Sequence, residues 1–106
     1  MAKTAYYVIS KQTGRIGRIT DDRRSRMDWE TSRSVLWSDG TKGEIEDNDR
    51  LSISEGLYEQ WAQIDAALVT HGVPDEILHN TRMLFVQVAR YEGLKRRVRD
   101  FYDLDN

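Results

Sequence analysis

The residues with the clearest chemical potential are basic side chains near the end of the chain. Residues 90–99 contain five of them against a single acid, Glu92. Guanidinium and ammonium groups gathered on one surface bind phosphate oxygens, and such binding weakens steeply as salt is added. The resulting candidates for nucleic-acid binding are Arg90, Lys95, Arg96, Arg97 and Arg99.

A second basic block occupies residues 11–26, where arginines and a lysine outnumber Asp21 and Asp22. An aromatic residue follows this block, and binders of single strands combine cations for the phosphates with rings that stack on bases. The two blocks act together only if folding brings them onto one surface. The candidates added by the second block are Arg23, Arg24, Arg26 and Trp29.

The end of a solvated helix accounts for the C-terminal basic block equally well. On a helical wheel Arg90 and Arg97 border one edge of an apolar face, Lys95 and Arg99 border the other, and Arg96 lies nearly opposite. Long basic side chains cover the rim of an apolar face with their methylene groups, and the helix dipole favours cations in the last turns. The nucleic-acid and the structural interpretations therefore both stay open.

Acidic residues supply an alternative binding surface. Residues 44–49 hold four acids and no base, and three more acids follow residue 99. Carboxylates in such a block can take the place of phosphates at a basic partner surface, which predicts a protein–protein interaction module or a nucleic-acid mimic. The candidate protein-binding residues are Glu44, Glu46, Asp47 and Asp49.

The sequence offers no candidate catalytic residue, metal ligand or cofactor site. The chain has no cysteine, which removes thiolate nucleophiles and cysteine zinc sites. His71 and His79 are eight residues apart, whereas a metal-binding pair on one helix face prefers a spacing of four. We therefore expect a protein that is not an enzyme and carries no cofactor.

Composition indicates one domain, residues 1–106, with 39% hydrophobic and 32% charged residues and a net charge of −2. The N-terminal apolar run, residues 5–9, is too short for a signal sequence or a membrane span. We expect a cytoplasmic protein of the host cell that has no contact with a membrane.

The elements that must position these residues differ between the two halves of the chain. Residues 1–51 are rich in strand and turn signals: residues 4–10 and 15–20 favour strands, and Asp39-Gly40 predicts a turn. Residues 22–38 are ambiguous, because apolar side chains alternate as in strands while nothing there would break a helix. A helix over 22–37 would allow a small helix-turn-helix regulator, which is a further alternative.

Residues 52–102 predict an antiparallel helical hairpin, with helices over about 53–70 and 74–102 and an acidic tail over 103–106. Ser52 and Glu55 form a capping-box pattern, and Gly72 and Pro74 mark the turn. The second helix overhangs the first by about 16 Å, so its apolar face must meet the N-terminal half, a second copy or a partner. That face consists of Ile77, Leu84, Val88, Tyr91, Leu94, Val98 and Phe101.

These elements predict an α+β fold, in which an N-terminal β-hairpin or meander packs on the C-terminal helical hairpin. An all-α bundle is the alternative if residues 22–38 are helical. The chain is expected to be a monomer or a homodimer.

The small size, the absence of active-site motifs and the charged blocks at residues 23–26 and 95–97 resemble small phage-encoded anti-CRISPR proteins, among them those against type I-E complexes. The resemblance implies a stoichiometric inhibitor without catalysis. Its partner would be a nucleoprotein complex of the CRISPR effector kind, or the single-stranded DNA that such a complex displays. This class has no diagnostic motif, so no residue role is carried over.

Overall fold

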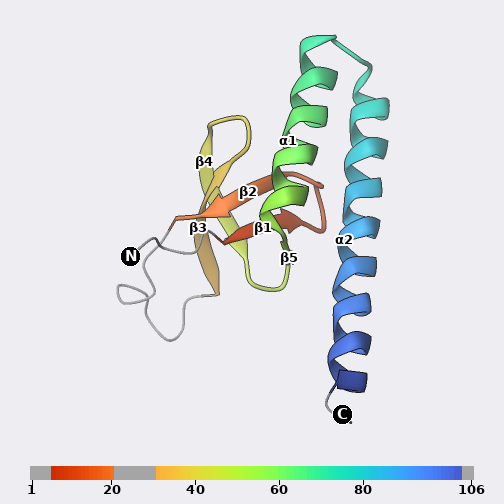
Figure 1. Cartoon of the computed structure of the whole chain (residues 1–106). Helices are drawn as coiled ribbons and strands as arrows, with labels where there is room; N and C mark the ends of the chain where they lie inside the picture. The colour runs from red at the N-terminus through yellow and green to blue at the C-terminus, as the bar shows by residue number, and fades with distance from the viewer. Residues whose placement is uncertain (1–5, 21–30, 104–106) are drawn as a thin grey trace.

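The computed structural model describes residues 6–20 and 31–103, with side chains as far as Arg99, and has the expected α+β fold. A five-stranded sheet is followed by two long helices that run side by side (Figure 1). The elements are β1 (Tyr7–Ser10), β2 (Ile16–Ile19), β3 (Ser32–Trp37), β4 (Lys42–Glu46), β5 (Arg50–Ile53), α1 (Glu55–Thr70) and α2 (Asp75–Asp103).

The sheet is an antiparallel meander whose last strand returns to the first. Strand order is β4-β3-β2-β1-β5, so β5 pairs with the free edge of β1 and places Tyr7 opposite Ile53. The turn between β1 and β2 uses Gly14 at φ 71°, a backbone conformation that strains residues with a β-carbon. Because β5 leads directly into α1, its pairing with β1 fixes where the helical hairpin begins.

Alternation along the strands gives the sheet two apolar faces. Ile9 and Ile16, which pair in register, point toward the helices and join a buried cluster with Trp61 and Phe85. The rings of Trp61 and Phe85 stack with centroids 4.8 Å apart. On the other face, side chains of β1, β3 and β4 form a second cluster: Val8, Val35, Trp37 and Ile45.

Strand β3 resolves the ambiguity in the second half of residues 22–38. Ser32–Trp37 pairs with β2 on one side and β4 on the other, and its buried side chains alternate with more exposed ones. The alternation of apolar residues was therefore the correct signal in that stretch. A helix over residues 22–37 is not formed at residues 32–37, which contradicts both the all-α bundle and the helix-turn-helix alternative.

The helical hairpin has the expected order, but its first cap differs from the prediction. Ser54, not Ser52, caps α1 by accepting a hydrogen bond from the Leu57 N–H at 3.2 Å, because Ser52 is still part of β5. The turn uses Gly72 at φ 65°, as its position after His71 predicted. Helix α2 runs through Gly93 without a break.

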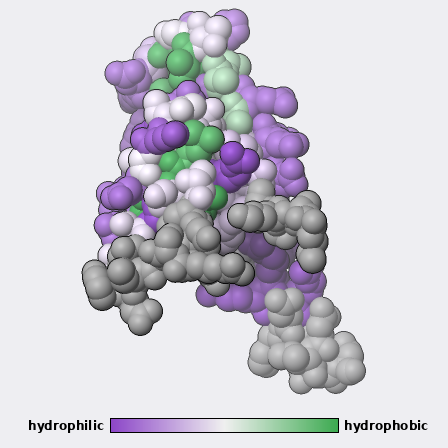
Figure 2. All heavy atoms as spheres, turned by 90° about the vertical axis from the view of Figure 1, so that its left-hand side faces the viewer, coloured by the Kyte–Doolittle hydropathy of each residue, from purple (hydrophilic) through white to green (hydrophobic). Residues whose placement is uncertain are grey.

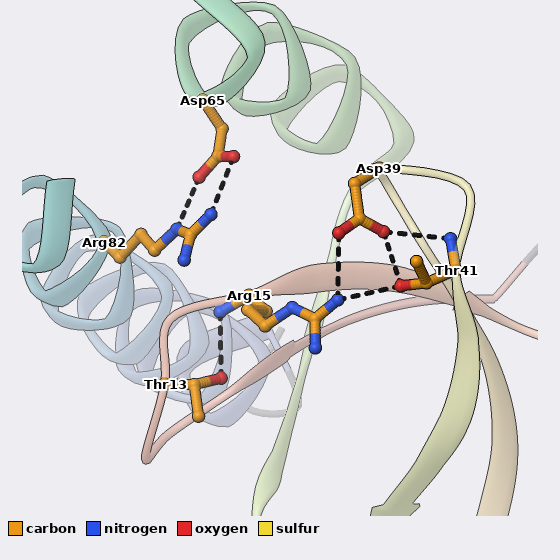
Figure 3. A network of polar contacts seen from close by, with 6 residues as sticks. All are labelled: Thr13, Arg15, Asp39, Thr41, Asp65 and Arg82. Atoms are coloured by element: carbon orange, nitrogen blue, oxygen red, sulfur yellow. Dashed lines mark hydrogen bonds and ion pairs between the residues drawn. The ribbon is translucent and has the colours of Figure 1, made fainter. Parts of the chain in front are cut away.

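Two ion pairs hold the turns and helices in place (Figure 3). Between the helices, Arg82 donates two hydrogen bonds to Asp65, at 2.6 and 3.0 Å, and these bonds raise the pKa of the arginine. Within the sheet, Arg15 pairs with Asp39 at 3.1 Å and lies over the Trp37 ring. Arg15 therefore has a structural role within the basic block of residues 11–26.

The apolar face predicted for α2 is not the face that packs. The buried residues Phe85, Val86 and Ala89 lie on the opposite side of the helix, which contacts α1 and the sheet. Within the part of the chain that the structure describes, six residues of the predicted face are 42–65% exposed. We call these six the outer stripe: Ile77, Leu84, Val88, Tyr91, Leu94 and Val98.

The outer stripe contrasts with the side of the molecule that the sheet presents. There the described residues are mostly hydrophilic, and the hydrophobic ones are few and separated (Figure 2). Of the nine large hydrophobic side chains exposed among the described residues, the six of the outer stripe all lie on α2. Exposed apolar surface is therefore concentrated on one helix.

Candidate anion-binding groove

A pocket of about 450 Å³ lies where the C-terminal half of α2 passes β5 and the end of β1. Its lining contains no acidic side chain. We call it the basic groove, and its lining residues are Lys11, Leu51, Ser52, Ala89, Arg90, Gly93, Arg96 and Arg97.

The spacing of small residues on α2 explains why a hollow forms there. Ala89 and Gly93 are four residues apart and so lie on the same side of the helix, facing β5. A β-carbon built on Gly93 would meet no atom within 4 Å, so the glycine leaves space open. The longer side chains of Arg96 and Arg97 follow one turn later and border this space.

Lys11 enters the groove from the sheet, and Asp49 holds the turn that carries it. Lys11 N–H donates to the Asp49 carbonyl at 2.7 Å, while the Asp49 carboxylate accepts hydrogen bonds from Ser10 Oγ at 2.6 Å and Gln12 N–H at 3.0 Å. The Lys11 ammonium group donates to the Asn48 carbonyl at 3.0 Å. These contacts position the lysine without neutralising it.

The groove carries four cations that have few intramolecular partners. Arg97 Nε has only a long hydrogen bond of 3.5 Å to the Gly93 carbonyl. Among the side chains of residues 6–20 and 31–99, Arg90 and Arg96 form no hydrogen bond or ion pair that would compensate their charge. Grouped cations with low-dielectric walls on one side raise the local concentration of anions. The groove is therefore suited to a ligand with several negative charges.

The structure divides the predicted nucleic-acid-binding residues into three groups. Arg90, Arg96 and Arg97 line one groove. Lys95 and Arg99 do not line it, because at helical spacing they lie on the side of α2 that carries the outer stripe. The remaining candidates lie outside the described residues, and they are Arg23, Arg24, Arg26 and Trp29.

Sequence reasoning did not select Lys11 as a site residue. The lysine precedes the arginines that it joins by 79 to 86 residues. It reaches them because β5, which precedes the helices, pairs with β1. The sequence did show that Lys11 follows a predicted strand and belongs to a basic block. It did not show which strand would pair with the one that Lys11 follows.

The acidic block is largely engaged within the chain. Asp47 pairs with Arg50 at 3.2 Å, and Asp49 holds the β1–β2 turn. Glu46 accepts a hydrogen bond from Thr31 Oγ1 at 2.8 Å. Only Glu44 of the four candidates is exposed and has no such contact among the described residues. These contacts favour a structural role for most of the block.

Among the described residues, no aromatic side chain lines the groove. Tyr7 packs against Tyr58 with ring centroids 4.4 Å apart and is partly buried. Tyr6 is more exposed, and its hydroxyl group lies 2.8 Å from Ser52 Oγ, a residue of the groove. The Arg50 guanidinium lies over the Tyr6 ring, 5.4 Å from its centroid. Tyr6 shares the sheet face of Val8, which is turned away from the helices, and is not part of the groove lining.

Comparison with known proteins provides no relative: no family model, no curated protein and no solved structure matches the chain. Among the described residues, neither helix has a stretch apolar enough to cross a membrane, and no group of three His, Asp or Glu side chains is arranged to hold a metal ion. The geometry of the groove is therefore the main basis for assigning a function.

Proposed function

We propose that this protein is a non-enzymatic binding protein that holds single-stranded nucleic acid in the basic groove. The observation that carries the proposal is the convergence of Lys11, Arg90, Arg96 and Arg97 on one hollow without a carboxylate in its lining. Guanidinium groups bind phosphate oxygens through paired hydrogen bonds, and a row of them follows a phosphate backbone. A flexible single strand can bend into such a groove.

The proposal extends to the setting in which the strand is bound. A nucleoprotein complex that displays a displaced strand offers the groove its ligand, and a small protein bound there blocks access by occupancy alone. This is the stoichiometric inhibition that the resemblance to anti-CRISPR proteins implies. The proposal places the protein in the cytoplasm of a host cell, where such complexes act.

The test is a titration of a fluorescently labelled single strand of about 15 nucleotides, followed by anisotropy at several salt concentrations. Four phosphate contacts predict that the logarithm of affinity falls with the logarithm of salt concentration with a slope of about −3. Replacing Arg96→Gln should weaken binding and make the slope less steep by about 0.7.

Lys42→Gln is the matched control. Lys42 is exposed on β4, outside the groove lining, and its replacement removes the same charge from the protein. Its salt slope should equal that of the unaltered chain. Absent binding, salt-insensitive binding, or an equal loss in the Arg96→Gln and Lys42→Gln variants would contradict the proposal.

A further inference from the structure

The outer stripe has the spacing of a helix-pairing seam. Ile77, Leu84, Tyr91 and Val98 recur at intervals of seven residues, which keeps them on one side of a helix that winds around another. Val88 and Leu94 widen this row. Helix α2 forms one side of the molecule, with α1 and the sheet on its other side, so the stripe faces outward (Figure 1).

We propose that the outer stripe pairs with the outer stripe of a second copy of this chain, with the two α2 helices antiparallel. The stripe is self-complementary along its length, because its ends and its centre are all apolar. An identical surface on both subunits is the usual arrangement of a twofold dimer. The proposed partner of the outer stripe is thus the same stripe on a second copy of the chain.

The charges of α2 select the antiparallel direction. On the side of α2 that carries the outer stripe, the first turn has Glu76 and the basic segment has Lys95 and Arg99. A parallel pair would bring four cations, two from each chain, to the same end of the seam. An antiparallel pair places Glu76 of each helix beside Arg99 of the other, and it also opposes the two helix dipoles.

The spacing of the stripe fixes a register for the pair. An antiparallel copy centred between residues 87 and 88 places Ile77 opposite Val98, and Leu84 opposite Tyr91, of the second copy. The six residues are 42–65% exposed in one chain, so pairing would remove apolar surface of both copies from water.

Pairing leaves the basic groove accessible. At helical spacing Ala89, Gly93 and Arg96 face the sheet, on the side of α2 opposite Leu84 and Tyr91. The two grooves of a dimer would thus lie on opposite outer sides of the helix pair. The pairing proposal does not depend on what the groove binds, and its test requires no nucleic acid.

Sedimentation of the full chain tests the pairing itself. The expected mass is twice the 12.4 kDa of one chain. Leu84→Glu combined with Tyr91→Glu should reduce it to the mass of one chain, while circular dichroism stays that of a folded protein, because both side chains are exposed. Val69→Glu on α1, also at an exposed apolar residue, should leave the dimer intact.

Cross-linking tests the direction, since the chain has no cysteine of its own. Ile77→Cys and Val98→Cys variants with tags of different mass are treated with a short thiol cross-linker, separately and mixed. The proposal predicts efficient cross-linking only in the mixture. A monomeric unaltered chain, or Ile77→Cys chains that cross-link to each other, would overturn the proposal.

Discussion

Leu84 and Phe85 are neighbours in the chain, about 100° apart around α2, but the first is 65% exposed on the outer face and the second 7% exposed on the inner face. The inner face, with Phe85, packs against α1 and the sheet and then continues into the basic groove. The outer stripe stays exposed and packs against no other element among the described residues. The comparison teaches that hydrophobic content alone does not identify the face that packs. The inner face packs because its residues fit Trp61 and β5, although it contains fewer large apolar residues.

The largest expected effect is the difference in stability between variants of Phe85 and Leu84. Phe85→Ala should lower the free energy of unfolding by about 3–4 kcal/mol, because it leaves a cavity beside Trp61. Leu84→Ala should cost less than about 0.5 kcal/mol in dilute protein, where the monomer predominates. Urea denaturation followed by tryptophan fluorescence measures both, and equal losses in dilute protein would contradict the assignment of the faces.

A somewhat smaller effect is expected at Gly14, which brings the β1–β2 turn against the inner face. A β-carbon there would lie 2.4 Å from the β-carbon of Arg82 and 2.6 Å from its carbonyl oxygen, and the backbone is at φ 71°. Gly14→Ala should therefore destabilise the fold by about 2–3 kcal/mol. Gly40→Ala is the control, since φ is also positive there but no atom lies within 4 Å. Denaturation midpoints should show the larger loss at Gly14.

Gly93→Ala, in contrast to Gly14→Ala, should stabilise the fold. Gly93 is inside α2, where glycine costs about 1 kcal/mol relative to alanine, and the added methyl group meets no atom within 4 Å. The variant should raise the free energy of unfolding by up to about 1 kcal/mol. Destabilisation would indicate that the helix requires a glycine there.

The smallest expected effect is on the stability of the fold at low pH, through Asp39. Hydrogen bonds from Thr41, together with Arg15, lower the pKa of Asp39 below its usual 3.8. A lowered pKa means that the charged form stabilises the fold above pH 3.8, and this contribution is lost as the pH falls through the lowered value. Asp39→Asn should thus be less stable than the unaltered chain at neutral pH, by a small amount for so exposed a group. The two denaturation curves should converge in acid, and a constant difference would contradict this account.

Local patterns predicted most of the elements. Gly72 and Pro74 identify the turn of the helical hairpin, and Asp39-Gly40 identifies another turn, because these residues act within a few positions of themselves. The alternation of residues 32–37 was correct for the same reason. Sequence reasoning therefore performed best where the physical cause is local. The predicted cap, Ser52, was wrong by two residues.

Long-range contacts account for what the sequence did not predict. The pairing of β5 with β1 brings Lys11 to the arginines of α2, and no local pattern specifies that pairing. Periodicity located an apolar face on α2 but could not distinguish a face that packs in the core from one that stays exposed, because both follow the period of the helix. The packing of α2 beside β5 likewise determines which arginines share a surface, and this packing is a long-range contact.

The central claim is that the inner and outer faces of α2 have different ligands, and salt titration of two double variants tests it most directly. Arg96→Gln with Arg97→Gln and Lys95→Gln with Arg99→Gln remove the same charge from adjacent positions of one helix. Binding of the labelled single strand should lose about 1.4 from its salt slope in the first variant and keep its slope in the second. An equal change in both variants would contradict the claim, because it would mean that the strand responds to the charge of α2 and not to the groove.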